Sequence, residues 1–163
     1  MRRLAEFLSG KWASIGFGLA MLAIGAGFGP IQAQFDGTLL DMITDGESAR
    51  GFIAWMTPEQ RTLHFWTTVL LDTAYPIAYV GFFAGLAARF SGDKAGLAML
   101  PALMTGIVDL AENAIQAMAL AGGADFLDLK AVLTPLKFGG VMLSAVLALV
   151  LVVVGVGRRI LKR

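Results

Sequence analysis

The segment F-G-G-V-M-L-S-A-V-L-A-L-V-L-V-V-V-G-V-G, from Phe138 to Gly157, contains no charged side chain. A helix needs about 20 predominantly apolar residues to cross the hydrocarbon core of a membrane, which is about 30 Å thick. A second segment, Trp12–Phe35, is equally free of charge and long enough to do the same. These two segments predict an integral membrane protein built from helices.

The composition of the chain favours the same class. Hydrophobic residues make up 57% of the 163 residues and charged residues 15%, whereas a soluble domain is about half apolar and a quarter charged. The mean hydropathy is +0.73. The length fits one domain, so residues 1–163 are expected to form a single membrane domain.

Several kinds of site are excluded by what the chain lacks. It has no Cys and a single His, so thiolate chemistry and Cys-ligated or His-rich metal sites are ruled out. No metal site is predicted, and the sequence indicates no particular cofactor. Phosphate-loop, dinucleotide and nucleic-acid motifs are also missing, so nucleic acid is not an expected partner.

Two further segments, Leu63–Ala88 and Leu97–Gly122, carry only sparse charge. We therefore predict an all-α integral membrane protein folded as a four-transmembrane-helix bundle. The predicted spans are about 12–35, 60–89, 97–122 and 134–157.

The helix boundaries are marked by capping patterns. Thr57, Pro58 and Gln60 have the spacing of a capping box with proline at the first helical position, which predicts that the second helix begins near Pro58 and runs to about Phe90. The pair Thr134-Pro135 is compatible either with a cap of the fourth helix or with a kink inside a longer helix.

The outer loop, residues 36–57, is too long for a bare connection. It mixes apolar and polar positions and contains Trp55, which suits a membrane interface. One or two short amphipathic helices are expected there, lying on the membrane surface. They would either cover a cavity or anchor the loop.

Basic residues orient the chain. They precede the first span, separate the second from the third and follow the fourth: Arg2, Arg3, Lys11, Arg89, Lys94, Arg158, Arg159, Lys162 and Arg163. Both termini are therefore expected in the cytoplasm, with the acidic loops outside. The basic start, the apolar run and the residues Ile31–Ala33 also fit a cleaved secretory signal, but the apolar run is long for one.

Polar residues within the predicted spans follow helical spacing. The third span carries Thr105, Asp109, Glu112, Asn113 and Gln116, the second Arg61, His64, Thr68, Asp72, Tyr75 and Tyr79, and the fourth Lys130, Thr134, Lys137 and Ser144. The sets of the third and second spans each fall on one helix face. A charge in the middle of a bilayer costs at least about 2.5–3.5 kcal/mol, so these faces should meet each other or water. They predict an internal polar cavity that opens outward.

The candidate site residues follow from the expected depth of each polar residue in the membrane. At about 1.5 Å per residue, Asp72, Glu112 and Lys137 fall within roughly one turn of each other, and Asp109 lies a turn deeper. These four are the candidate catalytic residues, and Tyr75, Tyr79, Asn113, Gln116 and Thr134 the candidate substrate-binding residues. Two alternatives stay open: the acids are interhelical hydrogen bonders, or Lys137 extends to the outer interface.

Pro76 and the start of the second span lead to two more expectations. Pro76 cannot donate to the carbonyl of Asp72, which is thereby free for another partner beside the Asp72 side chain. Arg61 and His64 are near the predicted surface, where solvation is the simpler expectation for both.

Three segments together resemble a known family. L-L-D-T-A-Y-P-I-A-Y (Leu70–Tyr79), D-L-A-E-N (Asp109–Asn113) and T-P-L-K (Thr134–Lys137) are similar, in this order, to the Asp…Tyr/Phe-Pro…Tyr, Asp-x-x-Glu-Asn and Thr-x-x-Lys elements of a family of small four-span bacterial membrane proteins. The resemblance implies a bacterial inner membrane. It adds Asp36, after the first span, and Arg61 to the candidate binding residues, and it implies no particular reaction.

Three functions are compatible with these patterns. The favoured one is a site that binds or chemically processes a lipophilic or lipid-derived molecule, since a carboxylate group beside a lysine offers both a proton donor and a proton acceptor. The second is proton- or cation-coupled transport, and the third a structural or assembly subunit of a larger membrane complex. Membrane lipid is the expected partner, and a homodimer is possible; whether the protein is an enzyme stays open.

Overall fold

All regular elements of the chain are helical. The computed structural model describes residues 1–161, and no strand occurs among them. In chain order the elements are α1 (Arg2–Leu8), α2 (Lys11–Gln32), η1 (Ala33–Phe35), η2 (Leu40–Met42), α3 (Gly46–Trp55), α4 (Pro58–Thr67), η3 (Thr68–Asp72), α5 (Thr73–Ser91), η4 (Gly92–Lys94), α6 (Ala95–Leu120), η5 (Leu127–Leu129) and α7 (Lys130–Ile160). The predicted all-α class is confirmed.

The predicted capping box is present at the start of α4. The Thr57 hydroxyl accepts a hydrogen bond from the Gln60 N–H (3.2 Å), and the Gln60 side chain accepts one from the Thr57 N–H (3.0 Å). Helical backbone then continues through η3, a single π-helical turn, into α5. Gly92, with φ of +57°, reverses the chain into α6.

The fourth long helix begins earlier than the predicted span. α7 starts at Lys130, so Pro135 lies inside the helix and Thr134 does not cap it. Of the two alternatives, the proline within a longer helix is the one adopted. Arg158 and Arg159 belong to the last turn of α7, whereas Lys162 and Arg163 lie outside the described residues.

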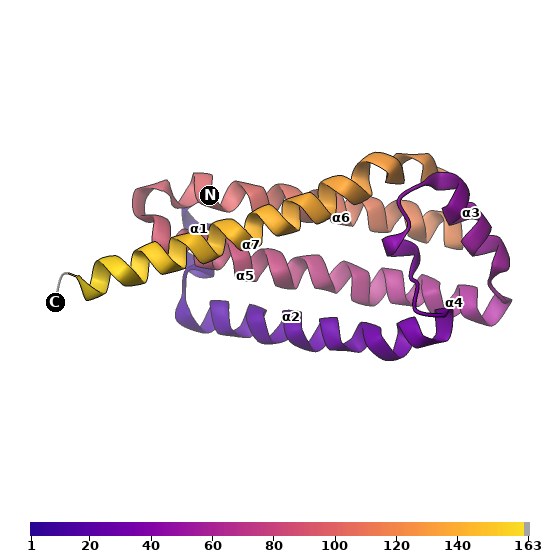
Figure 1. The fold of residues 1–163 in the computed structure, drawn as a ribbon, viewed down its shortest axis with the longest axis horizontal. Coiled ribbons are helices and arrows are strands. Elements are labelled where there is room, and N and C mark those ends of the chain that lie inside the picture. The colour runs from indigo at the N-terminus through magenta and orange to yellow at the C-terminus, as the bar shows by residue number, and fades with distance from the viewer. Residues whose placement is uncertain (162–163) are drawn as a thin grey trace.

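The fold has four long helical rods, α2, the continuous helix α4–η3–α5, α6 and α7. They lie side by side (Figure 1). α5 lies between α2 on one side and α6 and α7 on the other. Small residues allow the close approach: a Cβ on Gly106 would lie 2.7 Å from a methyl carbon of Val80, and one on Gly140 would lie 3.1 Å from Cβ of Thr105. Glycine at these two positions therefore sets how closely α6 packs on α5 and α7.

The apolar side chains of the rods point outward. On α7 the exposed residues include Leu143, Val146, Leu149, Val150 and Val153. Three helical stretches, Lys11–Phe35, Pro58–Leu120 and Leu127–Ile160, are long and apolar enough to cross a membrane. The middle stretch has 63 residues and reverses direction at η4 (Figure 1).

The two ends of the molecule differ. One end carries α3 and the α2–α3 loop, which we define as residues 33–45; the other carries α1 and η4 (Figure 1). They are called the α3 end and the α1 end below. The α2–α3 loop turns at Asp36 and Gly37, both with positive φ (51° and 83°). It then buries Phe35 and Leu40 completely, so it is packed onto the bundle.

Ion pairs hold α3 to the segment before α7. Arg50 Nε lies 2.5 Å from Asp125 Oδ2, and its Nη1 lies 3.0 Å from Asp128 Oδ1. The hydrogen bond from Arg50 holds the pKa of Asp125 below its ordinary value. These contacts are exposed, so they orient α3 more than they stabilise the fold.

Candidate functional site

α6 presents one polar face to the interior. The five residues predicted for this face are all buried: Thr105, Asp109, Glu112, Asn113 and Gln116. Their spacing of three or four residues places them along one side of the helix. The D-L-A-E-N segment therefore forms one wall of a buried polar region.

Glu112 is completely buried against two lysines of α7. Lys130 Nζ and the Thr134 hydroxyl (2.5 Å) both donate to Glu112 Oε1, and Lys137 Nζ lies 2.8 Å from Oε2. The three α7 residues recur every three or four positions, so one face of α7 delivers all of them. Close pairing of this kind offsets the desolvation of the buried charges.

Asp109 links α6 to both neighbouring helices. Its Oδ2 accepts a hydrogen bond of 2.9 Å from the Tyr79 hydroxyl of α5, and Lys137 Nζ lies 3.7 Å from Oδ1. Tyr79 is 1% exposed, so its hydroxyl has a partner where water does not reach. The carboxylate is thus held between a neutral donor and an ammonium group.

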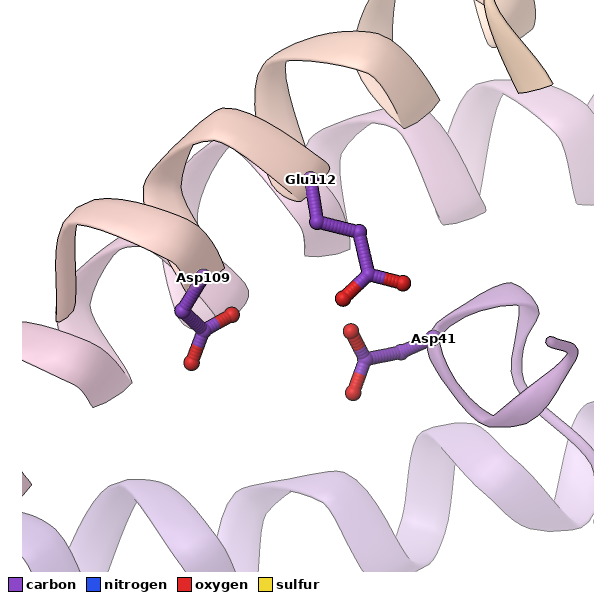
Figure 2. A group of neighbouring side chains, drawn as sticks. All are labelled: Asp41, Asp109 and Glu112. Carbon is purple, nitrogen blue, oxygen red and sulfur yellow. The ribbon is translucent and has the colours of Figure 1, made fainter. Parts of the chain in front are cut away.

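A third carboxylate reaches the site from the α2–α3 loop. Figure 2 shows the side chains of Asp41, Asp109 and Glu112 converging, Asp41 from the loop and the other two from α6. Asp41 forms an ion pair with Lys137 and accepts a hydrogen bond of 3.4 Å from the Gln116 amide. We call these three carboxylates the carboxylate cluster.

His64 fixes the loop beside Asp41. Its Nε2 accepts a hydrogen bond of 3.0 Å from the Leu40 N–H, so this nitrogen carries no proton and the ring is the Nδ1–H tautomer. Nδ1 lies 3.4 Å from the Thr68 hydroxyl. The expectation that His64 is solvated is wrong: the side chain is fully buried, because the α2–α3 loop folds over it.

The predicted effect of Pro76 is confirmed. The main-chain carbonyl of Asp72 accepts a hydrogen bond of 2.5 Å from the Asn113 amide of α6. The Asp72 side chain is 6% exposed, and its Oδ2 has no hydrogen-bond partner among the described residues. The main-chain carbonyl of Asp72 therefore has a partner, whereas one oxygen of its side chain has none among the described residues.

A pocket of about 260 Å³ adjoins the carboxylate cluster. Its lining combines acidic and apolar side chains from α2, the α2–α3 loop, η3, α5, α6 and α7: Gly25, Phe28, Gln32, Leu39, Asp41, Met42, Asp72, Tyr75, Asp109 and Phe138. Met42 and Phe138 are about half exposed, at 54% and 49%, and form its rim. The pocket thus combines acidic side chains, two of them buried, with half-exposed apolar ones.

Comparison of the chain with protein-family models, with curated proteins and with solved structures finds no match. What the site can do follows from its own geometry. Carboxylates, an ammonium group and a phenol lie within hydrogen-bond reach of one another, which is the arrangement that allows proton exchange with a bound molecule.

The carboxylate cluster also has the spacing of a cation site. One oxygen from each of its three carboxylates lies within 4.8 Å of the others. Lys137 Nζ, however, is within ion-pair distance of all three. Its ammonium group already supplies the positive charge at that point.

The predicted site residues separate into two groups. Those that line the pocket or bond within the buried polar region are Asp72, Tyr75, Tyr79, Asp109, Glu112, Asn113, Gln116, Thr134 and Lys137. Lys137 is 2% exposed, so it faces the site and does not extend to the surface. Arg61 instead donates to the Leu120 carbonyl (2.6 Å) at the end of α6, and Asp36 is exposed in the loop turn.

Two charged residues of the site were not among the sequence-based candidates. Lys130 shares the spacing of Thr134 and Lys137, so its periodicity was the signal that would have identified it. Asp41 belongs to a loop and has no periodic signal. Only the folding of that loop onto the bundle brings it to Lys137.

Proposed function

We propose that the chain is a bacterial inner-membrane protein that crosses the membrane four times, by α2, α4–α5, α6 and α7. The 26 residues of α6 span about 39 Å at 1.5 Å per residue, more than the hydrocarbon core needs. The outward apolar side chains of the rods support this placement. The resemblance to small four-span bacterial proteins supports the choice of membrane.

The α3 end faces away from the cytoplasm in this proposal. The α1 end carries Arg2, Arg3, Lys11, Lys94 and Arg158, and basic residues concentrate on the cytoplasmic side. α3, with Trp55 exposed at its end, then lies at the outer interface.

The absence of native cysteine makes this topology easy to test. Ser48→Cys, in α3, is expected to react with a membrane-impermeant maleimide on intact cells. Asp93→Cys, in η4, is expected to react only after permeabilisation. Both positions are exposed, so the reverse pattern would invert the orientation.

The function proposed for the site is binding or chemical processing of a lipophilic or lipid-derived molecule. The observation that carries it is the pocket itself, where buried acidic side chains meet apolar walls in one small volume. Such a combination is typical of small-molecule sites, where apolar surface gives affinity and a few polar groups orient the ligand. All lining residues belong to the half of the bundle near the α3 end, which favours binding over passage through the protein.

If the bound molecule is processed, the reaction is of the acid–base kind. Asp72 faces the pocket directly, and Asp109 reaches it between Tyr79 and Lys137. Glu112 lies behind them and holds Lys137 in place. Asp72 and Asp109 would therefore exchange protons with the ligand, and Glu112 and Lys137 would position and neutralise them.

The proposal is tested by three single substitutions, Asp72→Asn, Glu112→Gln and Lys137→Met. The variants are compared for cellular lipid composition and, by mass spectrometry, for the lipid that copurifies with the protein. Glu6→Gln is the matched control, because its exposed side chain lies in α1, far from the pocket. We expect Asp72→Asn to change the amount or identity of the bound molecule and the control to leave it unchanged.

Stable variants that alter neither measurement would overturn the proposal. A protein partner in stoichiometric amount, without bound lipid, would instead favour an assembly subunit.

A further inference from the structure

Asp72 is the acid of the site that forms no ion pair within residues 1–161. Lys130 is taken up by Glu112, and Lys137 lies among the three carboxylates of the cluster. No ion pair to Asp72 occurs within residues 1–161, and its Oδ2 is buried without a hydrogen-bond partner. In native proteins such an orphaned buried group calls for a specific explanation, a bound molecule being one.

The charge balance of the site points in the same direction. Four carboxylates, those of the cluster and Asp72, face two ammonium groups, and all of these groups are buried except Asp41, whose side chain is 23% exposed. Both ammonium groups lie on the α7 side, so the uncompensated negative charge is concentrated where Asp72 meets the pocket. A buried charge is tolerated when it is paired, and a positive group on a bound molecule would pair with Asp72.

The walls next to Asp72 suit an organic cation. The ring of Tyr75 packs edge-on against Phe28 with centroids 5.7 Å apart, and both rings line the pocket. Aromatic faces attract ammonium groups, most strongly where water is excluded. Gly25, also in the lining, places α2 next to the Tyr75 ring, since a Cβ at this position would lie 3.6 Å from the ring, in van der Waals contact.

We propose that the pocket binds a cationic amphiphile, a molecule with an ammonium head group and an apolar tail. The head group pairs with Asp72 beside the rings of Phe28 and Tyr75, and the tail passes between α2 and α7 over the half-exposed Phe138. This inference rests on the proposed function, because it names the charge of the molecule that the same pocket would take.

The test uses three photoreactive probes that share one twelve-carbon, diazirine-bearing chain and differ in the head group: an amine, an alcohol and a carboxylic acid. The full-length protein is placed in nanodiscs of phosphatidylcholine. Labelling is measured at equal probe content of the membrane, and the labelled residues are mapped by mass spectrometry.

The amine is expected to label α2 and α7 beside the pocket about tenfold more than the alcohol, which corresponds to about 1.4 kcal/mol. The acid is expected to label these helices less than the alcohol does. Asp72→Asn should bring amine labelling down to the level of the alcohol. Asp93→Asn, the same substitution at the exposed η4 turn, should leave it unchanged.

Equal labelling of the pocket by amine and alcohol would overturn the cationic ligand and leave the proposed function standing. No labelling of the pocket by any probe would overturn both. The comparison of probes on the unmodified protein needs no variant, so it decides the matter even if Asp72→Asn does not fold.

Discussion

The ion pair between Glu112 and Lys130 allows a quantitative test of the site. Both side chains are fully buried, and breaking a buried pair from one side costs about 3–5 kcal/mol because the other charge is left unpaired. Glu112→Gln removes the one ion-pair partner of Lys130 within residues 1–161, so its cost is expected in the upper part of this range. Lys130→Met leaves Glu112 with Lys137 at 2.8 Å, so about 3 kcal/mol or less is expected.

The double variant separates the pair from its surroundings. Glu112→Gln combined with Lys130→Met removes both charges, while Lys137 keeps Asp41 and Asp109. The combined loss should fall short of the sum of the single losses by about 2 kcal/mol, within the 0.5–3 kcal/mol typical of coupled neighbours.

Unfolding in mixed micelles with a rising fraction of SDS, followed by circular dichroism, gives the four free energies of the cycle. The matched control is the exposed pair of Arg2 and Glu6, which are 3.1 Å apart and 94% and 63% exposed. The same cycle with Arg2→Met and Glu6→Gln should yield a coupling of at most about 0.5 kcal/mol. A coupling at the buried pair no larger than that of the control would refute the geometry described for Glu112.

Three further predictions concern packing, the α2–α3 loop and pH. Gly140→Ala should destabilise the fold by about 1–3 kcal/mol because its Cβ collides with α6. The control Gly139→Ala, where the Cβ meets open space, should be neutral or stabilising by up to about 1 kcal/mol. Equal unfolding midpoints for the two variants would contradict the close packing of α6 on α7. His64→Phe should cost about 1–3 kcal/mol by leaving a buried N–H without its acceptor, and amide exchange in the α2–α3 loop should accelerate. Arg50→Gln should raise the pKa of Asp125 toward its ordinary value. The lowered pKa stabilises the fold above about pH 3.9, and this stability is lost as pH falls through the lowered value. The variant should therefore lose less stability on acidification than the unmodified protein, as unfolding measured at several pH values would show.

Much of the bundle followed from the order and spacing of residues. Long apolar stretches predicted the long helices, because a helix that crosses a membrane needs about 20 predominantly apolar residues. The capping box at Thr57 predicted the first residue of α4. The polar face of α6 was predicted from a helical period that needs no tertiary information. The missing N–H of Pro76 predicted that the Asp72 carbonyl would be free for another partner, and the structure identifies that partner as Asn113.

The rest of the site depends on a loop. Asp41 reaches Lys137, and Leu40 reaches His64, because the α2–α3 loop folds back over the bundle. Loop backbone has no period from which its path can be calculated. Asp36 was chosen for its position after the first span, yet Asp41, five residues on, provides the carboxylate of the cluster. Sequence spacing identifies faces of helices, and contacts from loops lie outside its reach.

Because η3 is a π-helical turn, the number of residues in this segment matters for the site as much as their identity. One π turn holds an extra residue, which rotates everything after it by about 100° relative to an uninterrupted α-helix. The turn thus changes the direction of Asp72 around the helix axis relative to that of His64. His64 faces the α2–α3 loop, and Asp72 faces the pocket. Deletion of a single residue from Thr68–Leu71 would preserve a long apolar helix, yet only one of the two side chains could keep its direction. A one-residue deletion here would therefore preserve a helix long enough to cross a membrane and yet prevent assembly of the site.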